Sequence, residues 1–287
     1  MENVIEIKNV TKNYSDFKLD NININIKKGF ITGFIGPNGA GKSTTIKLIM
    51  NLIRKDSGLI NIFGLDNTNH DREIKSRIGF VYDECCFYEN LKIISNEKVI
   101  SAFYKDWDHK KFISYLKRFE LNPNKRVKRL SKGMKTKFAI AIALSHNADL
   151  LIMDEPTAGL DPIFRRELLD ILYDLIQDEN KSIFFSTHIT SDLDKIADYI
   201  TFINKGQIVF SKSTDVINDN YKIIKGNKEL LSEIDKQYII GINKNRYGFD
   251  ALTTNSSKLI EKYQDSICIE NANLEDIMVY YIKKGEL

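Results

Sequence analysis

The sequence predicts an α/β fold with a mixed-sheet core, joined by an antiparallel β-subdomain, a helical subdomain and a small C-terminal α+β unit. Two short, continuously apolar runs, 150–153 and 182–186, flank a stretch with helical spacing at 164–177. A strand, a helix and a second strand in this order form a parallel pair with a right-handed crossover. A third apolar run, 30–35, leads through a glycine-rich loop into a helix-like segment at 44–53, an order that can build a phosphate site.

The N-terminal residues predict the antiparallel β-subdomain. Apolar and polar side chains alternate over 4–8 and again over 22–26, which is the period of half-buried strands. Residues 27–29 form a turn between the second of these strands and the apolar run that follows. Much later in the chain, 199–204 and 207–210 are typical of a hairpin.

Two further regions have sequence patterns that differ from those of this core. A helical pattern rich in aromatic residues runs from about Asn90 to Arg129, so we expect a helical subdomain at about 85–140 within a larger domain at 1–212. Beyond Ser213 the chain predicts a separate accessory domain, 213–287. Its expected strands and terminal helix lie near 221–225, 238–242, 267–270 and 274–283.

The bulk composition excludes several classes of protein. A length of 287 residues leaves room for one domain of about 200–250 residues and a small appendage. The 42 basic and 39 acidic residues give a net charge of only +3, so we expect a mixed-sign solvated surface and no nucleic-acid partner. No apolar run approaches the roughly 18–20 residues that cross a bilayer, and the N-terminus lacks signal-peptide features, so we expect a cytoplasmic location.

The cysteines indicate neither a disulfide framework nor a zinc site. Their number is odd, two of them are adjacent, and no histidine cluster completes a tetrahedral set. The three positions are Cys85, Cys86 and Cys268.

A phosphate-loop motif stands between the strand at 30–35 and the helix that follows. It matches the pattern G-x-x-x-x-G-K-[ST] and comprises Gly36, Pro37, Asn38, Gly39, Ala40, Gly41, Lys42, Ser43 and Thr44. In such a loop the backbone amides turn toward phosphate, and the positive end of the helix dipole adds to the attraction. We expect Lys42 to reach the β/γ oxygens of ATP and Ser43 to offer its hydroxyl to Mg²⁺.

Two carboxylates follow the apolar run at 150–153. A strand that ends in Asp154 places this side chain beside the phosphate loop, at the carboxyl edge of the sheet. We expect Asp154 to hold magnesium directly or through water. Glu155 is placed to orient or deprotonate the attacking water, so the pair predicts a nucleoside-triphosphate hydrolase.

Further motifs, in the same order along the chain, resemble those of the ATP-binding-cassette (ABC) family. Leu130-Ser131-Lys132-Gly133-Met134 is similar to the signature Leu-Ser-Gly-Gly-Gln, and it precedes the carboxylate strand. Residues 158–161 resemble the D-loop, His188 resembles the switch histidine, and Tyr14 resembles the ring that stacks on adenine, although Phe17 is an alternative. The resemblance covers about 2–212 and implies a P-loop NTPase of ABC type.

The resemblance also implies roles for these residues. The segment Ser131, Lys132 and Gly133 would hold the γ-phosphate of an ATP bound to a second subunit, since a helix N-terminus favours anions. Asp161 would cross the interface of a head-to-tail dimer formed with a second copy of the chain or a homologous cassette. Glu155 and His188 would be catalytic, and ATP and Mg²⁺ would be the cofactors. The motor would act on an integral-membrane permease from the inner face of the cell membrane.

The sequence departs from the family pattern at the Q-loop and in the signature. Asp83 occupies the position of the Q-loop glutamine, and the resemblance leaves open whether it ligates magnesium. Lys132 and Met134 replace glycine and glutamine in the signature. These departures resemble ATPase subunits of bacterial exporters with a separate permease chain, including exporters of peptide antibiotics. In that case a permease helix would contact some of the aromatic residues Phe87, Tyr88, Phe103 and Tyr104, while others would form an internal core.

The rival interpretations explain less of the sequence. A non-transport ABC protein, such as a ribosome-acting translation factor, usually carries two cassettes, and this chain has one. Chromosome-maintenance relatives insert long coiled coils before the signature, for which this chain has no sustained heptads. A plain NTPase does not account for the signature. The motor subunit of an ABC exporter is therefore the function that the sequence predicts, with its cargo unspecified.

Overall fold

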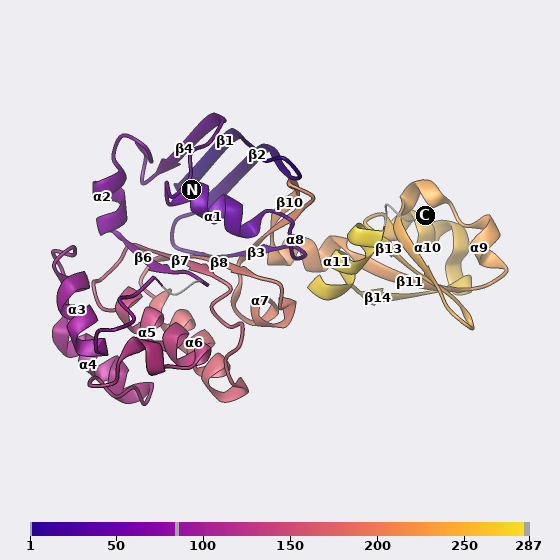
Figure 1. Cartoon of the computed structure of the whole chain (residues 1–287). Coiled ribbons are helices and arrows are strands. Elements are labelled where there is room, and N and C mark those ends of the chain that lie inside the picture. Colours follow the sequence, from indigo (N-terminus) through magenta and orange to yellow (C-terminus); the bar gives the residue numbers. More distant parts are fainter. Residues whose placement is uncertain (1, 84–85, 284–287) are drawn as a thin grey trace. The chain divides into compact units, whose positions relative to one another are not determined.

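The computed structural model describes residues 2–83 and 86–283. It divides into two compact units, which are described separately (Figure 1). The first unit comprises the chain up to His188 together with Thr201–Ser211, and the second comprises Ile189–Ile200 together with the chain from Lys212 onward.

A six-stranded sheet forms the centre of the first unit. Its strand order is β10-β9-β3-β8-β7-β6. The strands are β3 (Ile31–Ile35), β6 (Ile78–Val81), β7 (Leu150–Asp154), β8 (Ser182–Thr187), β9 (Tyr199–Asn204) and β10 (Gln207–Ser213). The pairs β3·β8, β8·β7 and β7·β6 are parallel, and every residue of β3, β7 and β8 is buried. Burial on both faces explains why these strands are continuously apolar in the sequence.

An antiparallel sheet with the order β2-β1-β4-β5 lies on one side of this centre, with α1 between the two sheets (Figure 1). Its strands and the helix are β1 (Asn3–Asn13), β2 (Lys18–Lys27), β4 (Ser57–Ile62), β5 (Leu65–Asp66) and α1 (Lys42–Ile49). Burial alternates along β2, as the sequence pattern predicts. One apolar cluster joins the layers, because it contains Ile7 of β1, Ile46 of α1 and Phe184 of β8.

The first helix is shorter than the sequence pattern predicts. It ends at Ile49 instead of continuing to residue 53, because Asn51 adopts a left-handed backbone conformation with φ of 50°. Asparagine tolerates this conformation better than most residues, so it ends helices readily.

Helices cover the opposite face of the central sheet (Figure 1). On this side lie α3 (Ile93–Ser101), α4 (His109–Arg118), the 3₁₀ turn Val127–Arg129, α5 (Lys132–Ala143) and α6 (Pro162–Leu175) (Figure 1). Helix α2 (Asp71–Ser76) lies on the side of the antiparallel sheet (Figure 1). A glycine allows α5 to approach β6 closely: a Cβ at Gly79 would lie 2.6 Å from the carbonyl oxygen of Ala143 and 2.4 Å from a methyl of Leu151. The absence of a side chain at Gly79 therefore lets α5 pack directly on β6.

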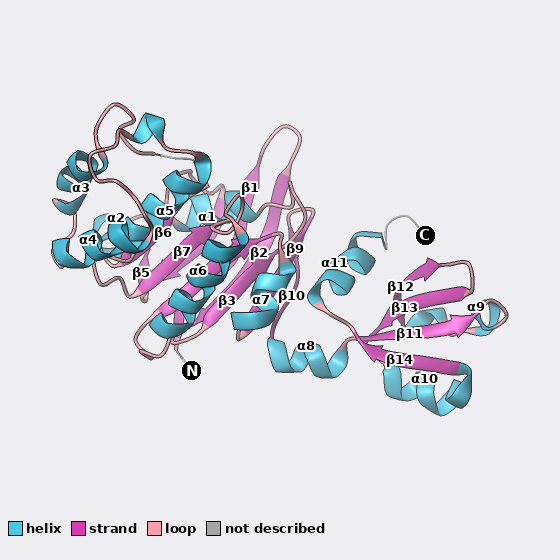
Figure 2. Ribbon diagram, turned by 90° about the horizontal axis from the view of Figure 1, so that it is seen from below, coloured by secondary structure: helices cyan, strands magenta, loops and turns pink. Residues whose placement is uncertain are grey.

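The second unit contains a four-stranded antiparallel sheet with the order β12-β13-β11-β14 (Figure 2). Its strands are β11 (Lys222–Asn227), β12 (Ile239–Lys244), β13 (Gly248–Thr253) and β14 (Ile267–Asn271). Its helices are α7 (Thr190–Ile196), α8 (Thr214–Asn220), α9 (Leu230–Glu233), α10 (Ser256–Tyr263), α11 (Leu274–Lys283) and the 3₁₀ turns Lys236–Tyr238 and Gln264–Ser266. Phe249 of β13 and Leu259 of α10 are both in its apolar core.

These layers confirm the predicted α/β fold. Within 2–83 and 86–283, no helix is both long enough and apolar enough to cross a membrane.

Candidate functional site

The phosphate loop connects β3 to α1 and holds its lysine in place. The Nζ of Lys42 donates hydrogen bonds to the carbonyl oxygens of Gly36, at 2.8 Å, and of Pro37, at 3.3 Å. A side chain at Gly36 would meet the backbone of Ile203, because its Cβ would lie 2.3 Å from that carbonyl oxygen. Gly41, which precedes α1, has a φ of 113°, a conformation that glycine adopts without strain. Close contacts and backbone conformation therefore explain why positions 36 and 41 are glycines, which the sequence pattern alone does not explain.

The side chains of Lys42, Glu155 and His188 meet where β7 ends. The Nζ of Lys42 lies 3.4 Å from Oε1 of Glu155, and the other carboxylate oxygen, Oε2, lies 2.8 Å from Nδ1 of His188. The backbone N–H of His188 donates to the same Oε2 at 3.2 Å. Glu155 thus has a fixed orientation, with one oxygen toward the phosphate loop and the other toward the histidine. The structure brings together the three residues that the sequence predicts for phosphate binding and catalysis.

Asp154 is buried at the end of β7. Its Oδ1 accepts a hydrogen bond from the hydroxyl of Ser186, whereas Oδ2 has no hydrogen-bond partner within 2–83 and 86–283. Burial raises the pKa of the Asp154 carboxyl, and hydrogen bonds from Ser186 and Ser43 offset part of this effect. A buried carboxylate with a free oxygen beside a serine hydroxyl suits Mg²⁺, which needs few protein ligands and keeps several waters. The residues present therefore fit the predicted magnesium.

Ser186 is a residue of this site that the motifs do not reveal. It pairs with Asp154 in the parallel ladder of β7 and β8. The predicted pairing of the two parallel strands is the signal that could have found it, since Ser186 lies directly opposite Asp154 on the neighbouring strand.

A polar cleft of about 690 Å³ opens over these groups. Its lining includes Phe17, Asn38, Lys42, Asp83, Glu155 and His188. Phe17 packs against the phosphate loop, because a Cβ at Gly41 would lie 3.0 Å from its ring. Tyr14 is not among the residues that line the cleft, its side chain is 46% exposed, and its ring centroid lies 6.5 Å from that of Phe17. Of the two aromatic candidates for stacking on adenine, Phe17 is the one that faces the cleft.

The signature segment begins α5. Ser131 is the N-cap of this helix, and its hydroxyl accepts a hydrogen bond from the backbone N–H of Met134 at 3.2 Å. A Cβ at Gly133 would lie 3.2 Å from the carbonyl oxygen of Gly159, so the signature packs against the D-loop of the same chain. Asp161 caps α6, accepting from the N–H of Phe164 at 2.9 Å, and this hydrogen bond lowers the pKa of its carboxyl. Ser131 and Asp161 thus shape the starts of their own helices.

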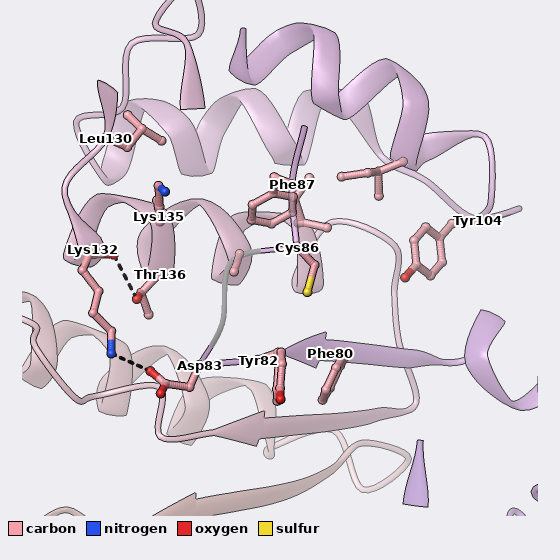
Figure 3. Close-up of a pocket in the computed structure, with 13 residues that line it drawn as sticks. Phe80, Tyr82, Asp83, Cys86, Phe87, Tyr104, Leu130, Lys132, Lys135 and Thr136 are labelled. Atoms are coloured by element: carbon pink, nitrogen blue, oxygen red, sulfur yellow. Dashed lines mark hydrogen bonds and ion pairs between the residues drawn. The ribbon is translucent and has the colours of Figure 1, made fainter. Parts of the chain in front are cut away.

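Two of the three residues that depart from the family pattern contact each other. The Nζ of Lys132 lies 2.7 Å from Oδ1 of Asp83 (Figure 3). Nothing in either sequence motif predicts this pair. Of the three cysteines, Cys85 lies outside the described residues, while Cys86 and Cys268 are both exposed.

A second cavity, of about 470 Å³, lies on the other side of this ion pair. It is an apolar groove bounded by the end of β6, by α3 and by α5, with Phe80, Tyr82, Phe87, Tyr104 and Ile142 among its lining residues (Figure 3). The ring of Tyr104 stacks on that of His146, with 3.8 Å between centroids. Tyr88 and Phe103 are exposed but are not among the residues that line the groove. The predicted aromatic region therefore divides into groove, surface and core residues.

Comparisons with known proteins agree on one family. The family model described as ABC transporter matches residues 19–158. The bacitracin transport ATP-binding protein BcrA of Bacillus licheniformis is 37% identical over 214 residues, which cover 73% of this chain and 69% of BcrA. The lantibiotic transport ATP-binding protein SrtF of Streptococcus pyogenes is 39% identical over 215 residues, covering 74% of this chain and 92% of SrtF.

The similarity to ABC cassettes extends to the three-dimensional fold, as one solved structure shows. It is the dimeric post-hydrolysis state of the ATP-binding cassette MJ0796 bound to ADP and Pi. It superposes with a TM-score of 0.66 at 25% identity, over 73% of this chain and 98% of that cassette.

Proposed function

This chain belongs to the ABC transporter family as an ATP-binding subunit that hydrolyses ATP, and from this premise we propose that it is the motor of a bacterial exporter. Two cassettes would sandwich two Mg-ATP head to tail and drive a separate permease. The observation that carries the proposal is the contact of Glu155 with both Lys42 and His188, at the end of the strand that bears Asp154. This arrangement supplies a phosphate-binding cation, a metal-binding carboxylate and a base in one polar cleft.

Each residue of the cleft has its own role in ATP hydrolysis. Lys42 and the loop amides bind the β- and γ-phosphates. Asp154 and Ser43 would hold magnesium, which supplies positive charge to the phosphates when it is bound. Glu155 orients the attacking water and takes its proton, and His188 fixes the Glu155 carboxylate through the 2.8 Å contact. Arrival of ATP draws Lys42 from Glu155 to the phosphates, which leaves the carboxylate free to act as the base.

The second half of each site would come from the partner cassette. Ser131 and Gly133 stand at the start of α5, where backbone N–H groups and the helix dipole favour an anion. In the proposed dimer they contact the γ-phosphate bound to the other cassette, and Asp161 reaches across the interface. A dimeric assembly of the similar cassette MJ0796 supports this arrangement.

The permease would dock on the apolar groove beside the nucleotide cleft. A groove lined by Phe80, Phe87 and Ile142 suits a short amphipathic helix, whose apolar side chains would fill it. This docking would hold the chain at the inner face of the cell membrane. Since BcrA and SrtF are named for transport of bacitracin and of a lantibiotic, we propose peptides or amphipathic antimicrobials as the exported class.

The mass of a Glu155→Gln variant tests the proposed mechanism. Removing the base slows hydrolysis and traps the sandwich, so light scattering should find a dimer of this variant with ATP and magnesium and a monomer without them. The matched control is Lys42→Ala in the same background, which should stay monomeric because it binds the phosphates poorly. A monomer under all conditions, while the unmodified chain hydrolyses ATP, would overturn the homodimer and require a different partner cassette.

A further inference from the structure

The ion pair between Asp83 and Lys132 stands at the border between two cavities. Both residues line the polar nucleotide cleft, and both also line the apolar groove. Asp83 follows β6, whereas Lys132 is the first residue of α5, so the pair joins two elements that are distant in the sequence. Figure 3 shows the two side chains extended toward each other at the edge of the groove.

The Asp83–Lys132 ion pair can separate at little cost, so that each side chain can bind another group. The side chains of Lys132 and Asp83 are 63% and 43% exposed, and an ion pair this open to water is weak enough to break without a large cost. Lys132 also stands at the positive end of the α5 dipole, where a cation is unfavourable unless an anion lies nearby. Asp83 supplies that anion in the nucleotide-free chain.

Asp83 also faces the cleft in which magnesium would be held. It lines this cleft together with Ser43, one of the proposed magnesium ligands, and with Glu155, which follows Asp154 in the chain. A divalent cation beside Asp154 would therefore attract the Asp83 carboxylate, and the triphosphate would attract the Lys132 ammonium. Both members of the pair gain a new partner in the same cleft.

We propose that Lys132 is a positioning residue that holds Asp83 away from the magnesium site until Mg-ATP separates the two. The proposal rests on the proposed function, because it requires Mg-ATP in the polar cleft. The family pattern has a neutral glutamine and a glycine at these two positions. This chain has opposite charges at both, and they pair with each other within one subunit.

The test is the magnesium dependence of nucleotide binding. Calorimetry with AMP-PNP, once in magnesium and once in EDTA, gives the ratio of the two affinities for each variant. Lys132→Gln should raise this ratio about two- to fivefold, the range expected for losing one exposed ion pair that competes with the metal. Magnesium reduces the negative charge of the nucleotide, so losing the direct attraction between Lys132 and the phosphates also raises the ratio. The same substitution in an Asp83→Asn background measures this second contribution.

Three further variants make the result specific. Lys132→Arg keeps the charge and should keep the original ratio. In an Asp83→Asn background, Lys132→Gln should raise the ratio by less than it does when Asp83 is present. Lys75→Gln removes a comparable surface ion pair, 2.8 Å from Asp71 on α2, and should have no effect. Melting temperatures measured in parallel verify that each variant is folded.

The outcomes separate the two proposals. An unchanged ratio in Lys132→Gln, or an equal rise with and without Asp83, would overturn the positioning role while leaving nucleotide binding intact. Failure of the unmodified chain to bind AMP-PNP would instead overturn the proposed function.

Discussion

Replacing Phe17 with alanine should weaken ATP binding far more than replacing Tyr14. Phe17 lines the nucleotide cleft and packs on the phosphate loop at Gly41, whereas Tyr14 is half exposed beside it. Stacking of a base on an aromatic ring contributes about 1–3 kcal/mol. This free energy corresponds to roughly 5- to 150-fold in Kd. We therefore expect Phe17→Ala to lose at least about fivefold in affinity, and Tyr14→Ala to lose less than about twofold.

The assay is calorimetric titration with ATP and, as an internal control, with tripolyphosphate, which has phosphates but no base. Phe17→Ala should lose affinity for ATP and retain its affinity for tripolyphosphate, because the phosphate contacts come from Lys42 and the loop. A larger loss in Tyr14→Ala would identify Tyr14 as the stacking ring. Equal losses for both ligands in Phe17→Ala would show that the ring only supports the phosphate loop, and the stacking argument would be refuted.

Two other substitutions probe the metal site and the groove. Asp154→Asn should raise the melting temperature of the nucleotide-free protein at neutral pH, because burial raises the pKa of Asp154 and so makes its charged form unfavourable in the fold. This gain should shrink as the pH falls through the raised pKa and vanish below the ordinary aspartate pKa, where the carboxyl is neutral in both states; a gain independent of pH would contradict the assignment. Thr136→Glu places a charge in the apolar groove, so it should abolish export by cells that express the chain with its permease while the purified chain keeps its ATPase rate. Loss of both activities together would argue against a docking role.

Local sequence patterns predicted the parts of the fold that are built from neighbouring residues. The phosphate loop between β3 and α1 is one case, because its glycines, its lysine and its helix are contiguous. The strand that ends in Asp154 is another, because a strand buried on both faces must be apolar throughout. In the second unit β13 was missed, since the sequence Gly-Phe-Asp-Ala-Leu-Thr at 248–253 has neither a clear alternation nor a strong strand preference.

Local sequence patterns could not predict which side chains from distant segments of the chain contact each other. The choice between Tyr14 and Phe17 depends on which ring packs against Gly41, and this requires knowing how the loop after β1 meets the phosphate loop. The pairing of Asp83 with Lys132 depends on the approach of α5 to β6, which the absence of a side chain at Gly79 permits. In the sequence Asp83 and Lys132 are separate departures from the family pattern, whereas the fold shows that the two side chains face each other.

The ionic groups of the cleft have partners within the chain. Lys42 pairs with Glu155 and Lys132 with Asp83, and the second oxygen of Glu155 contacts the ring of His188. A site of this kind avoids leaving partly buried charges without partners, which would be costly. In the proposed mechanism the phosphates compete with Glu155 for Lys42, so ATP binding must break this ion pair. Binding and release of the base would then be one event, and Glu155 would act on water only when a triphosphate has taken its cation.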